Sequence, residues 1–433
     1  MARRRLRDEN RVRGLGDARI ASAPDSSVVT VGFVELLTVA ALAEAVSGRR
    51  RRRPWRPTSP PLFQGGQLMQ VLRNAWYVAA WPDEITPETL LGRTILNQPV
   101  LMFRKGDGTP AAIGDRCPHR FAPLHLGRHM GDVVQCGYHG LEFGADGLCS
   151  RNPHGTGKKP PNAVVPAYPF VERHGMMWIW MGDSSAADEG LIPAEFAFVA
   201  DPQRAHIKGR LHIDANYQLL VDNLMDLSHA LYLHSGTLAT EQMQENFEPH
   251  ARLEGDVVIC EREQLNIEPP AIWVPALPPD AKRVDYFSNL SWHAPSNVIH
   301  PVGCRRVGEP EGVNGGVSSR SAHMFTPETD TTSHYFYCNS RDYGVDSAET
   351  DTRVRGVLEL VFGSQDRPMI EAQQKMIGDV DLMSLHPVVL PTDRASVLVR
   401  RRLAQLIARE QSPTAHSTSA LGRPTTAPAA VTE

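Results

Sequence analysis

The sequence predicts an α+β protein of two domains, the first built of β-strands and the second of mixed helix and strand. Short apolar runs separated by turn-forming residues fill the stretch from about residue 94 to residue 180. An apolar, helix-forming run covers Asn223 to His234, and further strand-like runs follow it. The length of 433 residues allows two domains, each with its own core.

Composition argues against several classes of partner. The formal net charge of -4 is small for this length, so it indicates binding neither to nucleic acid nor to an anionic membrane. The six cysteines are dispersed, without the density of a disulfide-stapled scaffold. This usage fits a reducing compartment, and the cytoplasm is the predicted location.

Residues 1–68 differ in composition from the rest of the chain. An arginine-rich start precedes an apolar run from Val28 to Val46. Because this run contains Glu35 and Glu44, which are costly at membrane depth, a spanning helix is not expected. A secretory signal is the alternative, although its charged segment would lie far upstream of the apolar one. We predict an atypical, dispensable extension that ends where globular patterning begins, at Met69.

The stretch 69–182 has the pattern of a small β-domain. Strand-like runs at 94–96 and 99–103 precede turn-forming residues, and the aromatic run Met176–Trp180 is expected to be the last strand. Proline and alanine residues then indicate a linker over 183–204.

Two cysteine–histidine pairs lie within this strand-rich sequence. Cys117 and His119 form one arm, Cys136 and His139 form the other, and the neighbouring proline and glycines suit tight loops. Structural zinc is the alternative, since two cysteines and two histidines satisfy a tetrahedral zinc ion. Zinc fingers usually draw both cysteines from one arm, whereas each arm here carries one cysteine and one histidine. The mixed arms predict a [2Fe–2S] centre with both thiolates on one iron and both imidazoles on the other, the Rieske ligand set.

A second candidate metal site lies between Asn223 and His234. The two imidazoles of His229 and His234, with a carboxylate from elsewhere, make the facial ligand set of non-haem ferrous iron. At about 100° per residue, Asp226 and His229 would share a helical face, whereas His229 and His234 would lie about 140° apart. The helix is therefore expected to distort or end near His234. The alternative is that both histidines are ordinary buried residues.

Together, the two motifs resemble a Rieske non-haem iron oxygenase. Within that family the chain is most similar to the oxygenase component of vanillate O-demethylase and to related methoxyarene and phenoxy demethylating monooxygenases. The similarity covers about residues 69–405, and further segments that carry it are Arg73–Ala79, His119–Leu124, Asn152–Gly155 and Trp178–Trp180.

The resemblance refines the expected fold. It implies an all-β Rieske [2Fe–2S] domain, then an α+β catalytic domain over 205–409 with a curved antiparallel sheet around a helix that carries mononuclear iron ligands. Residues 410–433 are rich in Ser, Thr, Ala and Pro, which predicts a disordered tail.

The resemblance also assigns roles to single residues. It places the third iron ligand at Asp366, with Glu371 as the alternative. It gives Asp226 the role of an electron bridge between the iron and the Rieske site of a neighbouring subunit, within a homotrimer. The candidates for direct contact with the substrate are Asn223, His300 and His323.

The implied activity is that of a terminal oxygenase in a multicomponent monooxygenase. With O2, a [2Fe–2S] cluster and mononuclear Fe(II), it would demethylate a methoxylated aromatic acid similar to vanillate and release formaldehyde. No glycine-rich dinucleotide fingerprint follows a strand, so a separate NAD(P)H-dependent reductase, with or without a ferredoxin, is expected to supply electrons. The alternatives are ring hydroxylation, including cis-dihydroxylation, and a Rieske protein that only transfers electrons.

Overall fold

The structure, a computed structural model, describes residues 70–244, 249–309 and 316–412. Every described residue belongs to one compact unit. The predicted extension 1–68 and residues 413–433 of the predicted tail lie outside the described residues. None of the described helices combines the length and apolar character needed to cross a bilayer.

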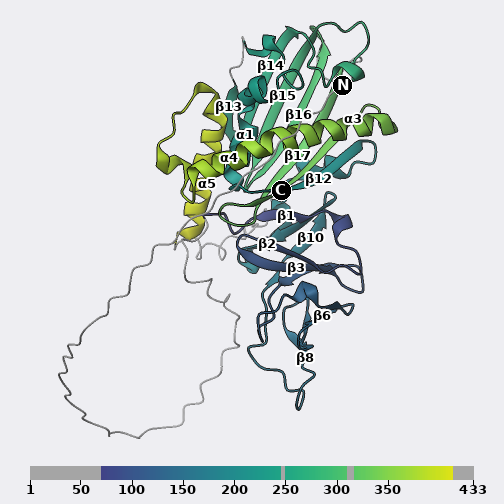
Figure 1. Ribbon diagram of the computed structural model, residues 1–433, viewed down its shortest axis with the longest axis vertical. Helices are drawn as coiled ribbons and strands as arrows, with labels where there is room; N and C mark the ends of the chain where they lie inside the picture. The colour runs from purple at the N-terminus through teal and green to yellow at the C-terminus, as the bar shows by residue number, and fades with distance from the viewer. Residues whose placement is uncertain (1–69, 245–248, 310–315, 413–433) are drawn as a thin grey trace, which may run out of the picture. The chain divides into compact units, whose positions relative to one another are not determined.

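Short antiparallel strands build the first part of the described chain (Figure 1). One sheet has the order β1 (Trp76–Ala80), β11 (Met176–Trp180) and β10 (Phe170–Arg173). A second has the order β2 (Leu91–Ile95), β3 (Gln98–Arg104), β4 (Pro110–Gly114) and β9 (Ala167–Tyr168). A third has the order β5 (Arg128–His129), β6 (Val133–Gln135), β7 (Glu142–Gly144) and β8 (Cys149–Arg151). The strands predicted near residues 94, 99 and 176 correspond to β2, β3 and β11.

The predicted linker is packed against this part of the chain. It contains the short helices η3 (Ser184–Ala186), η4 (Glu189–Leu191) and η5 (Ala194–Ala200). Phe196 is fully buried, and its ring meets that of Trp178 edge-on at 6.0 Å. Apolar burial therefore holds the connection in place.

A seven-stranded antiparallel sheet dominates the second part. Its order is β12 (Ala205–Ile213), β18 (Ser333–Arg341), β17 (Val317–Pro327), β16 (Asn297–Arg306), β15 (Val284–His293), β14 (Val257–Ile267) and β13 (His250–Glu254). Residues within each strand alternate between the two faces of the sheet.

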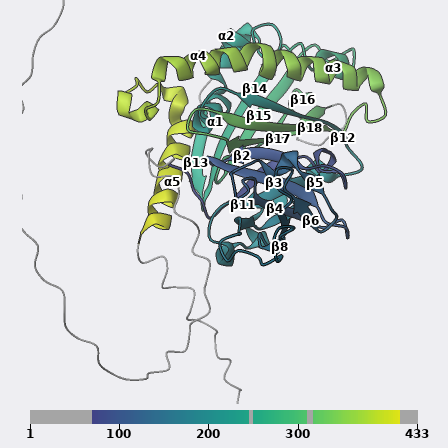
Figure 2. The same cartoon turned by 60° about the horizontal axis from the view of Figure 1, so that its bottom comes forward.

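Helices cover one face of this sheet. They are α1 (Tyr217–Met225), α2 (Ala230–Leu233), α3 (Ala348–Leu358), the π-helix η9 (Glu359–Asp366), α4 (Arg367–Ile377) and α5 (Arg394–Gln411). In Figure 2, α3 and α4 form one long rod over the sheet, and the strands of the first part lie on the opposite side. The remaining short helices are η1 (Pro82–Glu84), η2 (Leu124–Leu126), η6 (Leu227–His229), η7 (Glu241–Gln244), η8 (Val274–Ala276), η10 (Leu382–Leu385) and η11 (Pro391–Asp393).

The two parts share a core and direct hydrogen bonds. The Thr326 hydroxyl donates to the carbonyl of Val78 at 2.6 Å, and the Leu96 amide donates to the carbonyl of Pro327 at 2.9 Å. Met324 and Phe336 of the large sheet pack into the same buried cluster as residues of β1 and β11. One face of the large sheet therefore packs against the first part of the chain. The opposite face, which the helices cover, is the one that can form a pocket.

Candidate metal centres and substrate pocket

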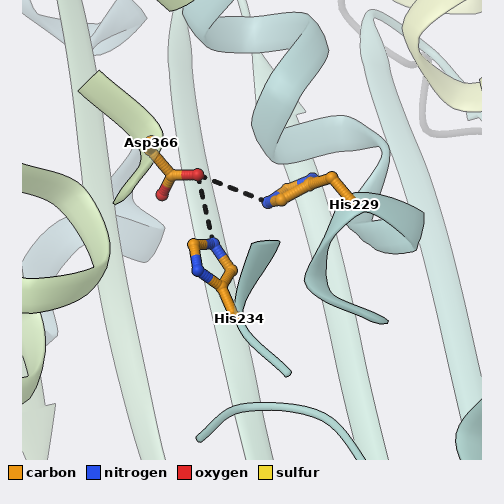
Figure 3. Close-up of side chains that lie close together, drawn as sticks. All are labelled: His229, His234 and Asp366. Carbon is orange, nitrogen blue, oxygen red and sulfur yellow. Dashed lines mark ion pairs between the residues drawn. The ribbon is translucent and has the colours of Figure 1, made fainter. Parts of the chain in front are cut away.

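Three side chains from separate segments of the chain point toward one another (Figure 3). Within the described residues, His229, His234 and Asp366 form one group whose ligand atoms all lie within 4.8 Å of one another. Asp366 Oδ1 lies 3.1 Å from Nε2 of His234 and 3.6 Å from Nε2 of His229. Glu371 is not in this group, because it binds Arg367 at 2.8 Å and accepts from the amide of Asp214 at 3.2 Å. Two nitrogens and one carboxylate oxygen fit the facial set for non-haem iron.

The histidines lie where helical structure breaks. Helix α1 ends at Met225 because Asp226 leaves the helical region, with φ -119 and ψ 91, and its carboxylate accepts from the amide of Ser228. Helix α2 ends at Leu233, so His234 follows with φ -114. The prediction that the helix ends near His234 is confirmed. The prediction that Asp226 and His229 share a helical face is wrong, because the break falls at Asp226.

A π-helix places the carboxylate. The segment Glu359–Asp366 joins α3 to α4 with a wider turn than an α-helix. Such segments are rare and occur frequently at functional sites, since the wide turn redirects side chains. Pro368 lies in the first turn of α4, where a missing amide hydrogen costs little. The helical distortion at this site is therefore a π-helix that ends at Asp366, whereas the segment of His229 and His234 contains ordinary helix ends.

Hydrogen bonds orient both imidazoles. Nδ1 of His229 donates to the carbonyl of Asp226 at 2.7 Å, and Nδ1 of His234 donates to Oε1 of Gln365 at 2.8 Å. Because both acceptors are oxygens without hydrogens, each Nε2 keeps its lone pair for a metal. Asn223 also donates to Oδ1 of Asp366, at 3.3 Å. Gln365 was not predicted, since nothing in the sequence indicates that it reaches a residue more than a hundred positions away.

Burial and the shared carboxylate act differently on the two histidines. Burial lowers the pKa of His229 despite the attraction of Asp366. For His234, burial is the largest single influence and would lower the pKa, yet hydrogen bonds to Asp366 and Gln365 together raise it. The carboxylate of Asp366 therefore stabilises a positive charge beside Nε2 of His234, and a bound metal ion would supply such a charge.

The cysteine–histidine arms lie on two loops of the first part. Cys117 and Cys136 are buried, whereas His119 is exposed and its ring lies 4.5 Å from that of His139. Each cysteine begins a tight turn. The amide of Phe121 donates to the backbone carbonyl of Cys117, and the amide of Gly140 donates to that of Cys136. Two buried cysteines beside two more accessible histidines match a dinuclear cluster whose irons differ in ligand type.

The helix-covered face of the large sheet encloses a pocket that includes His229, His234 and Asp366. Its apolar lining includes Leu220, Leu227, Ile272, Trp273, Val361 and Phe362. Polar groups come from the strands and from α1, and all three predicted contact residues, Asn223, His300 and His323, line it. The pocket therefore combines a metal-ligand group, apolar walls and a few polar side chains, as ligand sites commonly do.

The polar side chains are joined across neighbouring strands. Nε2 of His300 lies 2.9 Å from the Ser288 hydroxyl, Nδ1 of His323 lies 2.7 Å from the Tyr335 hydroxyl, and Asn339 donates to Ser321 at 3.0 Å. Burial lowers the pKa of His300 to about 3 and that of His323 well below its usual range. Both imidazoles are thus neutral hydrogen-bonding groups. Sequence reasoning missed Ser288, Ser321, Tyr335 and Asn339, because strand register decides which residues face the pocket.

Known proteins match the chain over both regions. Residues 75–169 match the Rieske [2Fe-2S] domain, and residues 213–409 match the vanillate O-demethylase oxygenase C-terminal domain. The oxygenase component of chloroacetanilide N-alkylformylase from Rhizorhabdus wittichii is 38% identical over 350 residues, which cover 81% of this chain and 99% of the relative. The oxygenase component of dicamba O-demethylase from Stenotrophomonas maltophilia is 38% identical over 344 residues, which cover 78% and 98%. A crystal structure of dicamba monooxygenase with non-heme iron and dicamba has a TM-score of 0.66 at 35% identity, covering 79% of this chain and 98% of that one.

These matches confirm the predicted fold class and the two cofactors, a Rieske [2Fe–2S] cluster and a mononuclear non-haem iron. The cysteine–histidine arms lie in the first matched region, which excludes the zinc alternative, and the His229, His234 and Asp366 group lies in the second. A protein that only transfers electrons would not need that second region. The chain therefore belongs to the Rieske non-haem iron oxygenases and is the terminal oxygenase component of a monooxygenase.

Proposed function

We propose that the chain removes the methyl group from a methoxylated aromatic acid and releases it as formaldehyde. The observation that carries this proposal is the pocket, in which the metal-ligand group faces apolar walls with polar side chains along the strands. A flat, largely apolar ring with one or two polar substituents suits such a lining. The relative named as a dicamba O-demethylase supports the type of reaction.

His229, His234 and Asp366 are the proposed ligands of the mononuclear iron, and Cys117, His119, Cys136 and His139 those of the [2Fe–2S] cluster. When bound, these centres supply the electrons and the activation of O2. The chain itself holds the substrate: His300 and His323 offer neutral hydrogen-bonding groups, and the apolar walls limit access of water. Hydroxylation of the methoxy carbon gives a hemiacetal, which breaks down to a phenol and formaldehyde.

Asn223 is proposed to act mainly through the carboxylate ligand rather than through the substrate. Its side chain lines the pocket, but its amide donates to Asp366 at 3.3 Å. A hydrogen bond to a ligating carboxylate fixes that oxygen in place. Asn223 is therefore proposed as a positioning residue for the iron site.

A homotrimer is proposed for electron transfer, with Asp226 as the bridge between one subunit's iron and the next subunit's cluster. Three large apolar side chains close in sequence to the cluster ligands are exposed in the single chain: Phe121, Leu126 and Tyr138 are 68%, 72% and 65% exposed. Such a group of apolar side chains supports a contact with a neighbouring subunit. The Asp226 side chain is 17% exposed, so a neighbouring histidine can reach its carboxylate. Its backbone carbonyl meanwhile accepts from the ligand His229.

A separate reductase is proposed as electron donor, because the names of both relatives identify an oxygenase component. The same proposal allows a ferredoxin to carry electrons from the reductase to the cluster. The cytoplasm is proposed as the location, because all six cysteines are free of disulfides. The proposed domain boundaries are 69–182 and 205–409, with a packed connection between them and residues 1–68 dispensable.

The test is to assay methoxybenzoates with a surrogate reductase and to measure formaldehyde and phenol. We expect the two products in equal amounts from at least one vanillate-like acid, with O2 consumed. A cis-diol or another ring-hydroxylated product without formaldehyde would instead establish ring hydroxylation.

A further inference from the structure

Asn339 carries a buried oxygen, Oδ1, that has no hydrogen-bond partner within the described residues. The residue lies on β18, is 9% exposed, and lines the same pocket as the metal-ligand group. Buried polar atoms are normally hydrogen-bonded, and one left unpaired costs free energy. A group bound in the pocket is therefore the partner that this oxygen calls for.

His323 on β17 carries a second such atom. Its Nε2 is buried and unpaired within the described residues, and the residue is 1% exposed and lines the pocket. Its Nδ1 lies 2.7 Å from the Tyr335 hydroxyl, whose hydrogen has no other acceptor in the described part of the chain. Tyr335 therefore donates to Nδ1, and the single proton of the neutral imidazole lies on Nε2. His323 thus offers a donor and Asn339 an acceptor.

Strand register places this donor and this acceptor on one face of the sheet. Ser321 pairs with Asn339, and His323 pairs with Tyr337, so Asn339 is the diagonal neighbour of His323. Diagonal neighbours are within reach of each other when the side chains are large. The amide nitrogen of Asn339 donates to the Ser321 hydroxyl at 3.0 Å, which fixes the side chain on the wall.

A hydroxyl is the substituent that matches both atoms. It can donate to the Asn339 oxygen and accept from Nε2 of His323 at the same time. A methoxy oxygen or an ionised carboxylate only accepts, so either would leave the Asn339 oxygen without a hydrogen.

We propose that Asn339 determines specificity by accepting a hydrogen bond from a hydroxyl on the ring of the substrate, to which His323 donates. This inference rests on the proposed function and deepens it, because it requires the methoxylated acid to carry a hydroxyl as well. A site built to bind a hydroxyl discriminates against the analogue without it, since the buried oxygen then stays unpaired.

The test compares two pairs of acids: vanillate and isovanillate, each with the analogue in which fluorine replaces the hydroxyl. Fluorine is close to a hydroxyl in size but donates no hydrogen bond. Isothermal titration calorimetry on the iron-loaded protein, under argon and without reductant, measures affinity without turnover. In at least one pair we expect the wild type to bind the hydroxy acid about tenfold to a hundredfold more tightly than the fluoro acid.

Variants of Asn339 assign this preference to its oxygen. N339L removes the amide at similar volume and N339S removes it at smaller volume, so both should reduce the preference to less than about twofold. N339D keeps an acceptor oxygen in the same shape and should keep most of the preference. The visible spectrum of the cluster reports that each variant is folded.

Asn289 provides a matched control. It lies on β15 of the same sheet, is half-buried and does not line the pocket, so N289S should keep the preference of the wild type. The inference is overturned if the wild type prefers the hydroxy acid in neither pair, or if folded N339L or N339S keeps the full preference. A wild type that prefers the hydroxy acid but releases no formaldehyde contradicts the proposed function alone.

Discussion

The two metal sites of this chain are built in opposite ways. The proposed cluster ligands lie within residues 117–139, on two loops, and His119 among them is exposed. The proposed iron ligands span residues 229–366, at helix breaks, and His234 and Asp366 are 1% and 6% exposed. A site made by neighbouring loops can remain at the surface, whereas a site made by distant segments requires the packed core between them.

The contrast corresponds to what each site must do. Electrons come from another protein, so the cluster needs an imidazole edge that a partner can approach. Oxygen chemistry on a substrate needs a pocket from which water is excluded. The following predictions test this division, beginning with the largest expected effect.

Removing an interior ligand should abolish the interior site alone. In H234A we expect product formation to fall to background, and the iron content to drop from about three to about two per chain, because only the mononuclear site loses its metal. The visible spectrum of the cluster should not change. Iron analysis and absorbance check this, with H250A as a control, since His250 is exposed on β13. Loss of the cluster spectrum in H234A would show that the two sites are not independent.

Replacing the proposed bridge, Asp226, should leave the metal content of both sites unchanged. D226N should retain both metals and the affinity for substrate, yet its turnover should fall close to background, because the carboxylate between the centres is lost. Single-turnover oxidation of the reduced cluster, followed by absorbance, measures the step directly. D214N is the matched control, because the Asp214 side chain is exposed and does not line the pocket. Normal cluster oxidation in D226N would refute the bridge.

The hydrogen bond from His234 to Gln365 should tune the interior site more mildly. Q365A removes the acceptor, and we expect the iron affinity to fall by about tenfold to a hundredfold. Q365E retains an acceptor oxygen and should keep most of that affinity. Titration of the iron-depleted protein with ferrous ion distinguishes the variants. Equal affinities for Q365A and the wild type would mean that other contacts orient the ring.

The smallest expected effect concerns stability against pH. His300 has a folded pKa of about 3, so the unfolded chain binds a proton below about 6.5 that the folded protein does not. This residue therefore lowers the free energy of unfolding as pH falls from about 6.5 toward 3, by up to about 1.4 kcal/mol per pH unit. Urea denaturation at pH 7.0 and 5.5 should show a decrease about 1 kcal/mol smaller in H300Q than in the wild type. An identical decrease would indicate that His300 is not buried as described.

The contrast between the local cluster site and the iron site built from distant segments also explains which features could be predicted from the sequence. The pairs Cys117–His119 and Cys136–His139 are local motifs, and their loops need only short turns. The strands β2, β3 and β11 were also predicted, because short apolar runs between turn-forming residues indicate a strand wherever they lie. By contrast, Asp366 was selected over Glu371 only by resemblance, and no local pattern indicated the π-helix that carries it. The contacts of Gln365, Ser288 and Asn339 depend on register and on packing between segments far apart in the chain.

The sequence by itself determined the classes of element, the cluster loops and the two histidines of the iron site, because turns, periodicity and short motifs are properties of neighbouring residues. Only the tertiary structure decided which carboxylate joins those histidines and which polar side chains face the substrate. The physical reason is that strand register and helix packing are set by burial of the whole apolar surface, to which every segment contributes.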